Sequence, residues 1–208
     1  ALTTKNDDVL LTSAKGLAVR FSDEKVRQMG RDARGVRGIN LREGDRLVGM
    51  CTFARDSAAT LVTMCERGYG KRSPLSDYPT KNRGGKGVIG IKTTTRNGNL
   101  TAVRIVAEED HLILISDKGK LIRIRVKDIP TLSRATQGVR IMRLDDGEIV
   151  AAIERLADPG EETGIAEAAP IEAMDESDTL PVEAEGDIIE EDDDDDAGDD
   201  EAGDDSAE

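Results

Sequence analysis

The chain has 208 residues and a formal net charge of −14, and this average hides two parts of opposite sign. All 29 Lys and Arg residues lie at or before Arg155 together with 19 acidic residues, so residues 1–157 carry +10, whereas residues 158–208 carry −24. Such an asymmetry indicates a basic surface that attracts a polyanion, joined to an acidic tail. No apolar stretch approaches the length that spans a bilayer and no signal peptide is recognised, which excludes a membrane-spanning class and predicts a cytoplasmic protein.

One pattern recurs along the chain at intervals of about fifty residues, as in repeat architectures. Its first anchor is an apolar run that ends in a polar turn and a glycine, at residues 9–16, 61–68 and 112–119. Its second anchor is a basic loop followed by Gly-Val, at residues 31–36, 83–88 and 134–139. A glycine turn follows at Gly44, Gly98 and Gly147, and the middle unit has two additional residues before that turn. Because both anchors keep spacings of 52 and 51 residues, chance is a poor explanation.

Each unit predicts about four short β-strands in the same order. The first anchor is a strand, and an alternating strand follows, such as residues 120–126, with apolar side chains on one face and basic ones on the other. A Gly-Val-x-x-Ile strand, a glycine turn and a last strand such as residues 149–153 complete the unit. Short helical turns are expected within residues 20–29 and 127–132. Few windows carry the 3.6-residue period of a helical solenoid, so a propeller-like array is favoured.

The predicted fold class is all-β, with about three four-stranded blades and an acidic tail. We expect the repeats to occupy residues 1–157, with blades at about residues 9–58, 59–110 and 111–157 and the end of a preceding blade at residues 1–8. Residues 158–208 have almost no clustered apolar side chains and contain an unbroken acidic run at 190–196. Such a segment cannot bury enough apolar surface to offset its ordering entropy, and we expect it to be disordered.

Cationic side chains recur at equivalent positions of the three units. If the blades stand around an axis, these positions form a curved basic rim along which duplex DNA would bend, with contacts to phosphates rather than to bases. In the loop of residues 81–87, glycines allow backbone N–H groups to approach phosphate while Arg83 and Lys86 supply charge. The alternative for such a loop is a tight turn with solvated charges. The candidate DNA-binding residues are Arg20, Arg31, Arg34, Arg37, Lys71, Arg72, Lys81, Arg83, Lys86, Lys120, Arg123, Arg134 and Arg140.

Other chemistries find little support in the sequence. Cys51 and Cys65 lack metal-ligand spacing and are expected to be small, reduced, buried side chains, and His111 has no triad or ligand partner. We therefore predict no catalytic residue, no metal-binding residue and no cofactor in this chain. Two Tyr, two Phe and no Trp provide no stacking platform for single strands, so double-stranded DNA is the predicted partner.

Several segments strongly resemble the repeats of the C-terminal domain of the bacterial DNA gyrase A subunit. The resemblance rests on residues 30–39 (GRDARGVRGI), 68–78 (GYGKRSPLSDY), 96–98 (RNG) and 136–141 (TQGVRI), and covers about residues 3–157. It implies a β-pinwheel, a propeller-like disc of about five or six blades that exchange strands, with DNA wrapped around its basic rim. It also implies a part in a type IIA topoisomerase that supercoils DNA negatively with ATP hydrolysis.

The resemblance carries further expectations about partners and location. The B subunit, together with the remainder of the A subunit, would complete an A2B2 enzyme at the nucleoid, which binds ATP and Mg²⁺ outside this chain. The catalytic tyrosine region is absent, so the chain is not expected to cut DNA by itself. The family's gyrase-A box, Gln-Arg-Arg-Gly-Gly-Lys-Gly, is matched only in its last five positions, by residues 83–87, since Lys81 and Asn82 replace the first two. We interpret this segment as a degenerate copy of the box.

Two alternative functions stay open at this point. One is the related C-terminal domain of the topoisomerase IV A protein, which has fewer blades and binds DNA without robust supercoiling. The other is a protein-interaction propeller whose acidic tail recruits basic partners. The tail itself is either a competitor of DNA for the basic surface or a segment that promotes solubility.

Overall fold

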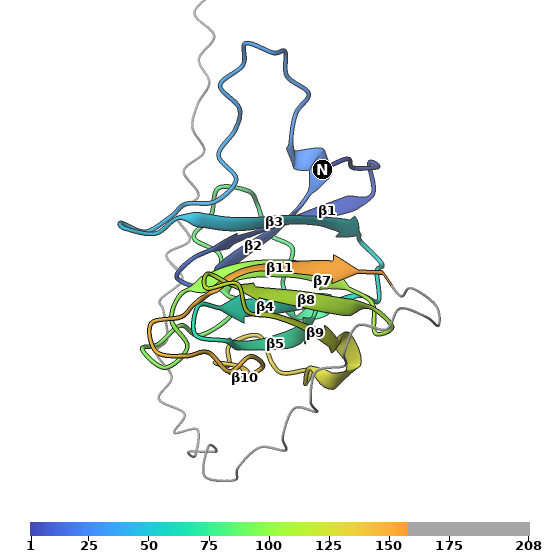
Figure 1. Cartoon of the computed structure of the whole chain (residues 1–208). Helices are drawn as coiled ribbons and strands as arrows, with labels where there is room; N and C mark the ends of the chain where they lie inside the picture. Colours follow the sequence, from blue (N-terminus) through green and yellow to red (C-terminus); the bar gives the residue numbers. More distant parts are fainter. Residues whose placement is uncertain (158–208) are drawn as a thin grey trace, which may run out of the picture. The chain divides into compact units, whose positions relative to one another are not determined.

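A computed structural model describes residues 1–157 of the chain (Figure 1). The predictions for residues 158–208, including their disorder, lie outside the described residues. Within the described part, the regular structure consists of eleven β-strands and three single-turn 3-10 helices, so the all-β prediction is confirmed. None of these helical turns has the length or the apolar character needed to cross a membrane.

The elements fall into three successive groups of similar order. The first group contains β1 (Asp7–Ser13), β2 (Leu17–Ser22), η1 (Asp23–Lys25) and β3 (Leu47–Ala54). The second contains β4 (Thr60–Cys65), β5 (Tyr69–Pro74), η2 (Leu75–Asp77), β6 (Val88–Ile89) and β7 (Leu100–Val106). The third contains β8 (His111–Ser116), β9 (Leu121–Arg125), η3 (Val126–Asp128), β10 (Val139–Arg140) and β11 (Val150–Leu156).

Three antiparallel sheets exchange strands between neighbouring units (Figure 1). The first sheet has the strand order β3-β1-β2-β6, and its edge strand β6 comes from the second unit. The second sheet has the order β10-β5-β4-β7, and its edge strand β10 comes from the third unit. Leu17 pairs with Ile89 at the first exchange and Tyr69 pairs with Arg140 at the second. The strand exchange that distinguishes a β-pinwheel is therefore present.

Two details of the prediction are wrong. The third sheet, of order β11-β8-β9, has three strands rather than four, because the fourth strand of each other sheet comes from the following unit. The residues described contain no unit after the third. Residues 36–39, predicted as the Gly-Val-x-x-Ile strand of the first unit, form no strand. Strands at this position pair with the sheet of the preceding unit, and residues 1–157 contain no such sheet.

The core lies between successive sheets. Leu10, Leu61 and Leu112 occupy equivalent positions of β1, β4 and β8, and all three are fully buried. Strand β7 packs against β3 on one side and against β11 on the other. Five of the six residues of β4 are buried, as are six of the seven residues of β1, so these strands lack the alternation of a half-exposed sheet.

The glycine of the first anchor is required where an exchanged strand crosses it. Gly16 and Gly68 have φ angles of 81° and 79°, and a Cβ atom on either would lie 2.1 Å from the carbonyl oxygen of Ile91 or Met142 in the following unit. Gly119 has the same backbone conformation, with a φ of 82°, but no atom lies within 4 Å of its Cβ position. The repeated glycine therefore reflects both a left-handed turn and a close backbone approach.

Candidate nucleic-acid interface

The loops of the second anchor are joined from one unit to the next by backbone hydrogen bonds. Gly84 N–H donates to the carbonyl oxygen of Gly38 at 2.7 Å, and Asn40 N–H donates to that of Gly85 at 2.9 Å. One unit later, Lys92 N–H donates to the carbonyl oxygen of Thr136 at 3.0 Å, the equivalent of the Asn40 bond. We call the segments 31–40, 81–92 and 134–143 together the loop row. The loop row brings basic residues from three distant parts of the sequence to neighbouring positions.

An arginine of each later loop reaches back to the preceding one. Arg83 donates to the carbonyl oxygen of Arg37 at 3.3 Å and to that of Lys25 at 3.0 Å. Arg134, its equivalent, donates to the carbonyl oxygen of Ile89. These bonds hold the backbone of the loop row in place, and Arg83 is still exposed. Arg31 has the equivalent position in the first unit and is exposed.

The predicted residues differ widely in exposure and fall into three groups. The exposed ones are Arg31, Arg34, Arg37, Lys81, Arg83, Lys86 and Arg140. The half-buried ones are Lys120, Arg123 and Arg134. The buried ones are Arg20, Lys71 and Arg72. All seven exposed residues belong to the loop row, which makes it the candidate interface.

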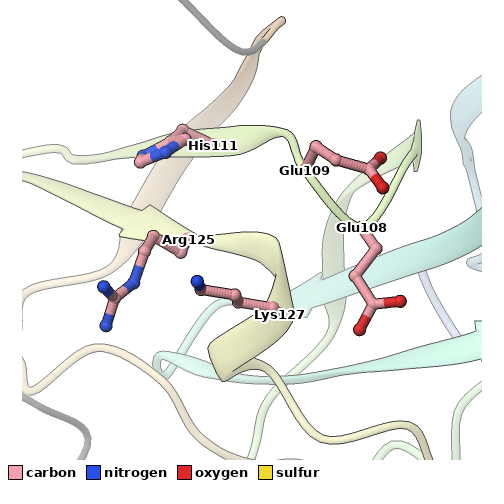
Figure 2. A pocket seen from close by; sticks show the side chains of 5 residues that line it. All are labelled: Glu108, Glu109, His111, Arg125 and Lys127. Carbon is pink, nitrogen blue, oxygen red and sulfur yellow. The ribbon is translucent and has the colours of Figure 1, made fainter. Parts of the chain in front are cut away.

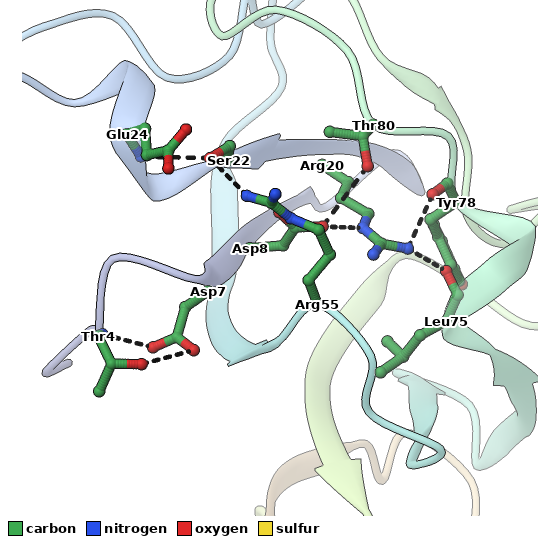
Figure 3. Close-up of polar contacts among 10 residues, drawn as sticks. All are labelled: Thr4, Asp7, Asp8, Arg20, Ser22, Glu24, Arg55, Leu75, Tyr78 and Thr80. Atoms are coloured by element: carbon green, nitrogen blue, oxygen red, sulfur yellow. Dashed lines mark hydrogen bonds and ion pairs between the residues drawn. The ribbon is translucent and has the colours of Figure 1, made fainter.

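Arg20 is committed to the protein interior (Figure 3). Its Nε donates to Asp8 at 2.7 Å, and its Nη1 donates to the carbonyl oxygens of Leu75 at 2.7 Å and Tyr78 at 3.3 Å. The guanidinium also lies over the ring of Phe53, 5.1 Å from its centroid. Because Leu75 and Tyr78 belong to the second unit, Arg20 clamps two units together. We correct the prediction that it contacts DNA.

Lys71 and Arg72 need the same correction. Arg72 is the equivalent of Arg20, and its Nε donates to the carbonyl oxygen of Ile129 in the third unit at 2.7 Å. Lys71 is fully buried, and its Nζ donates to the carbonyl oxygens of Ser133, at 2.5 Å, and of Arg134. Burial lowers the pKa of Lys71 to about 8. The backbone of the following unit covers the side chains of Arg20, Lys71 and Arg72. The alternation of residues within one strand does not reveal that cover.

Arg123 is the equivalent of Arg20 and Arg72 in the third unit, and no following unit covers it among the described residues. It is half-buried, and its Nε donates to Nδ1 of His111 at 3.1 Å.

Lys120, another predicted residue of the third unit, pairs with Asp145 at 3.2 Å and with Glu148 at 3.0 Å. The Ser116 hydroxyl, which donates to the Glu148 carboxylate, lowers the pKa of Glu148 to about 2, assisted by the Asp145 N–H and Lys120. Paired in this way, Lys120 contributes little net charge.

Arg96 was missed by the sequence prediction. Its guanidinium carbon lies 5.0 Å from the ring centroid of Tyr69, and that of Arg140 lies 5.3 Å from the same centroid. Arg140 also donates from Nη2 to the Tyr69 hydroxyl at 2.7 Å. Burial raises the pKa of Tyr69, but hydrogen bonds from Arg96 and Arg140 outweigh it, so the pKa is lowered. The two additional residues of the middle unit were the signal that could have drawn attention to this turn.

A separate pocket lies where β8, β9 and η3 meet (Figure 2). It has a volume of about 340 Å³ and is lined by Glu108, Glu109, His111, Arg125 and Lys127. Acidic and basic side chains both line it, so it has no single charge preference. Among residues 1–157, no three His, Cys, Asp or Glu side chains are placed to hold a metal ion. Cys51 and Cys65 are free thiols whose pKa burial raises, to about 12 for Cys65.

Comparisons with known proteins agree with the architecture. The family described as DNA gyrase C-terminal domain, beta-propeller, matches residues 7–50, 60–107 and 110–157. The chain is 43% identical over 155 residues to the DNA gyrase A subunit of Staphylococcus epidermidis and 44% identical over 161 residues to that of Escherichia coli K12. These alignments cover 74% and 77% of this chain, but the chain spans only 17% and 18% of the relatives' length.

Solved structures show the same fold. The DNA gyrase A C-terminal domain superposes with a TM-score of 0.68 at 26% identity, over 74% of this chain and 52% of that domain. The C-terminal domain of DNA topoisomerase IV superposes with a TM-score of 0.70 at 24% identity, over 75% and 48%. The second likeness concerns the fold alone. From the family match, the identity to the gyrase relatives and the exchanged strands together, the chain belongs to the DNA gyrase A C-terminal domain family.

Proposed function

We propose that the chain binds double-stranded DNA along the loop row and bends it, as the DNA-wrapping part of a gyrase A subunit. The observation that carries this proposal is that seven exposed Arg and Lys residues belong to the loop row, whose segments hydrogen bonds join from unit to unit. Cations repeated at regular intervals along the protein can neutralise the regularly spaced phosphates of duplex DNA. The two relatives described above are gyrase A subunits, which supports the same assignment.

The contacts would be made to the DNA backbone rather than to bases. Duplex bound along successive loops must follow them, and deformation of DNA by phosphate contacts alone needs no base-specific side chain. Gly85 leaves room for phosphate close to the backbone: a Cβ there would meet only one neighbour, the Asn82 carbonyl oxygen at 3.9 Å. The seven exposed residues and Arg134 are the proposed primary contacts, and Arg123 and Lys120 are secondary ones.

The wider setting is part of the proposal. The chain would act with the B subunit, and with the rest of the A subunit, in an A2B2 type IIA topoisomerase that supercoils DNA negatively. ATP and Mg²⁺ would bind in other parts of that enzyme. The chain itself would bind and bend DNA without breaking it.

Binding to linear duplex DNA over a series of salt concentrations tests the proposal. We expect log K to fall linearly with log salt, with a slope of about −0.9 for each phosphate neutralised, and little dependence on sequence. Charge-removing substitutions at Arg34 and Lys86 should each reduce the slope by about 1. Salt-independent or absent binding would contradict the proposal and would favour a protein-interaction propeller.

Bending needs a separate measurement. A nicked plasmid sealed by ligase in the presence of the chain should show a shift in linking number if DNA is wrapped with one hand. A naked plasmid sealed in parallel gives the reference distribution. An unchanged distribution together with tight binding would mean that the chain binds DNA without wrapping it.

The topoisomerase IV A protein is the second candidate, because the C-terminal domain of topoisomerase IV superposes slightly better than that of gyrase. This likeness is at 24% identity and concerns the fold alone, whereas the gyrase relatives are 43–44% identical over most of the chain. The gyrase assignment is therefore preferred. The linking-number experiment also separates the two, since a wrapping domain shifts the distribution more strongly.

A further inference from the structure

We propose that Arg96 and Arg140 form a phosphate-binding pair for DNA, and that Tyr69 is the residue that positions both guanidinium groups. The inference rests on the proposed function and deepens it, because it adds Arg96 as a contact and assigns a role to Tyr69. It concerns the junction between β5, β10 and the turn at residues 94–98.

The geometry brings two cations to one aromatic side chain. Arg140 stands directly opposite Tyr69 in the pairing of β10 with β5, and its Nη2 donates to the Tyr69 hydroxyl at 2.7 Å. The guanidinium carbons of Arg96 and Arg140 lie 5.0 and 5.3 Å from the centroid of the same ring, within the range of a cation–π contact. Tyr69 is only 5% exposed, whereas Arg96 and Arg140 are both exposed. The tyrosine thus forms a buried support beneath two cations that face solvent.

The turn that carries Arg96 is held in place by its neighbour Asn97. The Asn97 side chain is fully buried, and its Nδ2 donates to the carbonyl oxygens of Lys92 at 2.9 Å and of Gln137 at 3.0 Å. Its Oδ1 accepts from the N–H of Thr94 at 2.7 Å. Gln137 belongs to the segment that leads into β10. Asn97 therefore couples the position of Arg96 to that of Arg140.

This arrangement is particular to the middle unit. The two additional residues before Gly98 lengthen the turn that bears Arg96, and the residues equivalent to Tyr69 in the other units are Leu17 and Lys120. Neither alternative could supply both a ring and a hydroxyl. The repeat pattern alone therefore does not account for the cluster.

Two guanidinium groups on one phenol are suited to a phosphodiester. Both guanidinium groups lie against the same ring, and an anion that accepts from both would make several charge-assisted hydrogen bonds. Side chains already fixed on Tyr69 lose less conformational freedom when the anion binds. The competing interpretation is that the cluster only fastens β10 to β5.

The decisive variants are Arg96→Gln, Arg140→Gln and Tyr69→Phe, measured for binding to a linear duplex over a salt series and for unfolding in urea. Each Arg→Gln change should lower the salt slope by about 0.9, the value for one phosphate. Tyr69→Phe keeps both cations, so the slope should be unchanged, but affinity should fall about two- to tenfold because the guanidinium groups are less well fixed. The urea midpoint of Arg96→Gln should stay at the wild-type value.

Lys5→Gln is the matched control, because it removes one exposed positive charge from the segment before β1. It should change the slope less than either Arg→Gln variant. If Arg96→Gln and Arg140→Gln alter urea unfolding but leave the salt slope at the control value, the cluster is a structural fastening and the inference is overturned. If the wild-type chain binds DNA and the variants bind equally well, this inference alone is contradicted. If the wild-type chain does not bind DNA, the proposed function is contradicted as well.

Discussion

The carbonyl oxygen of Ile91 lies 2.1 Å from the position that a Cβ atom would take on Gly16, although 75 residues separate the two in sequence. The carbonyl oxygen of Gly16 in turn accepts from the N–H groups of Gly90 at 2.7 Å and Ile91 at 3.2 Å. Any side chain at residue 16 must therefore displace the exchanged segment that completes the first sheet.

Alanine substitutions at the three equivalent glycines should separate the two requirements of this position. Gly119→Ala should cost about 1–2 kcal/mol, the penalty of a left-handed conformation, because its Cβ meets open space. Gly16→Ala and Gly68→Ala should cost clearly more in urea unfolding, since the clash adds to the same penalty. Equal losses at all three sites would refute the role of the exchanged segment.

Arg20 and Arg34 should show opposite phenotypes. Arg20→Met leaves Asp8, which is fully buried, without its closest partner and should lower the free energy of unfolding by about 3–5 kcal/mol. The folded protein should keep its affinity for duplex DNA. Arg34→Met, on an exposed loop, should leave urea unfolding unchanged and weaken DNA binding. The double variant Asp8→Asn/Arg20→Met should recover part of the lost stability, and no recovery would argue against the buried pair.

Lys71 should make stability rise with pH in mildly alkaline solution. Its folded pKa of about 8 lies below the ordinary value of 10.5, so the unfolded chain binds this proton more tightly. Stability is therefore gained as pH rises from 8 toward 10.5, with about 1 kcal/mol expected between pH 8 and 9. The comparison with Lys71→Met isolates this contribution, because raised thiol and phenol pKa values act in the opposite direction above pH 9. Parallel stability curves for the two proteins would show that Lys71 does not titrate there.

Glu148 should contribute to stability in the acid range. Its pKa is lowered from 4.5 to about 2, so its contribution is present above pH 4.5 and is lost as pH falls toward 2. Ser116→Ala removes the hydroxyl that donates to the carboxylate and should raise the pKa of Glu148, as seen in the NMR titration of its side-chain carboxyl carbon. The titration of the same carbon in the wild-type protein serves as the reference. If Ser116→Ala leaves the pKa of Glu148 unchanged, Lys120 rather than Ser116 causes the low pKa.

The repeated anchors predicted the all-β fold because each marks a turn that any unit must make. Gly16, Gly68 and Gly119 lie at equivalent turns, and the strands around them follow local apolar patterning. Pairing between units is different, because β6 and β10 pair with residues of β2 and β5 that lie about seventy positions earlier in the sequence. No local pattern states which sheet a two-residue strand will join.

The candidate site was predicted less completely than the fold, for two physical reasons. Alternation along β2 and β5 placed Arg20, Lys71 and Arg72 on a basic face, but chain from the following unit covers that face. Arg96 lies in a turn with two residues that the other units lack, so comparison between repeats did not point to it. Positions on the loops themselves, such as Arg34 and Lys86, are exposed as expected.

The exchanged strands also determine how the array comes apart. A repeat protein whose units merely stack can lose an end unit and keep the others, because each unit is complete by itself. Here the first sheet contains Val88 and Ile89 of the second unit, and the second sheet contains Val139 and Arg140 of the third. Removing one unit therefore strips an edge from its neighbour. Tension applied to a single loop by bound DNA would be shared across interlocked sheets, so the array should yield as one cooperative body rather than unit by unit.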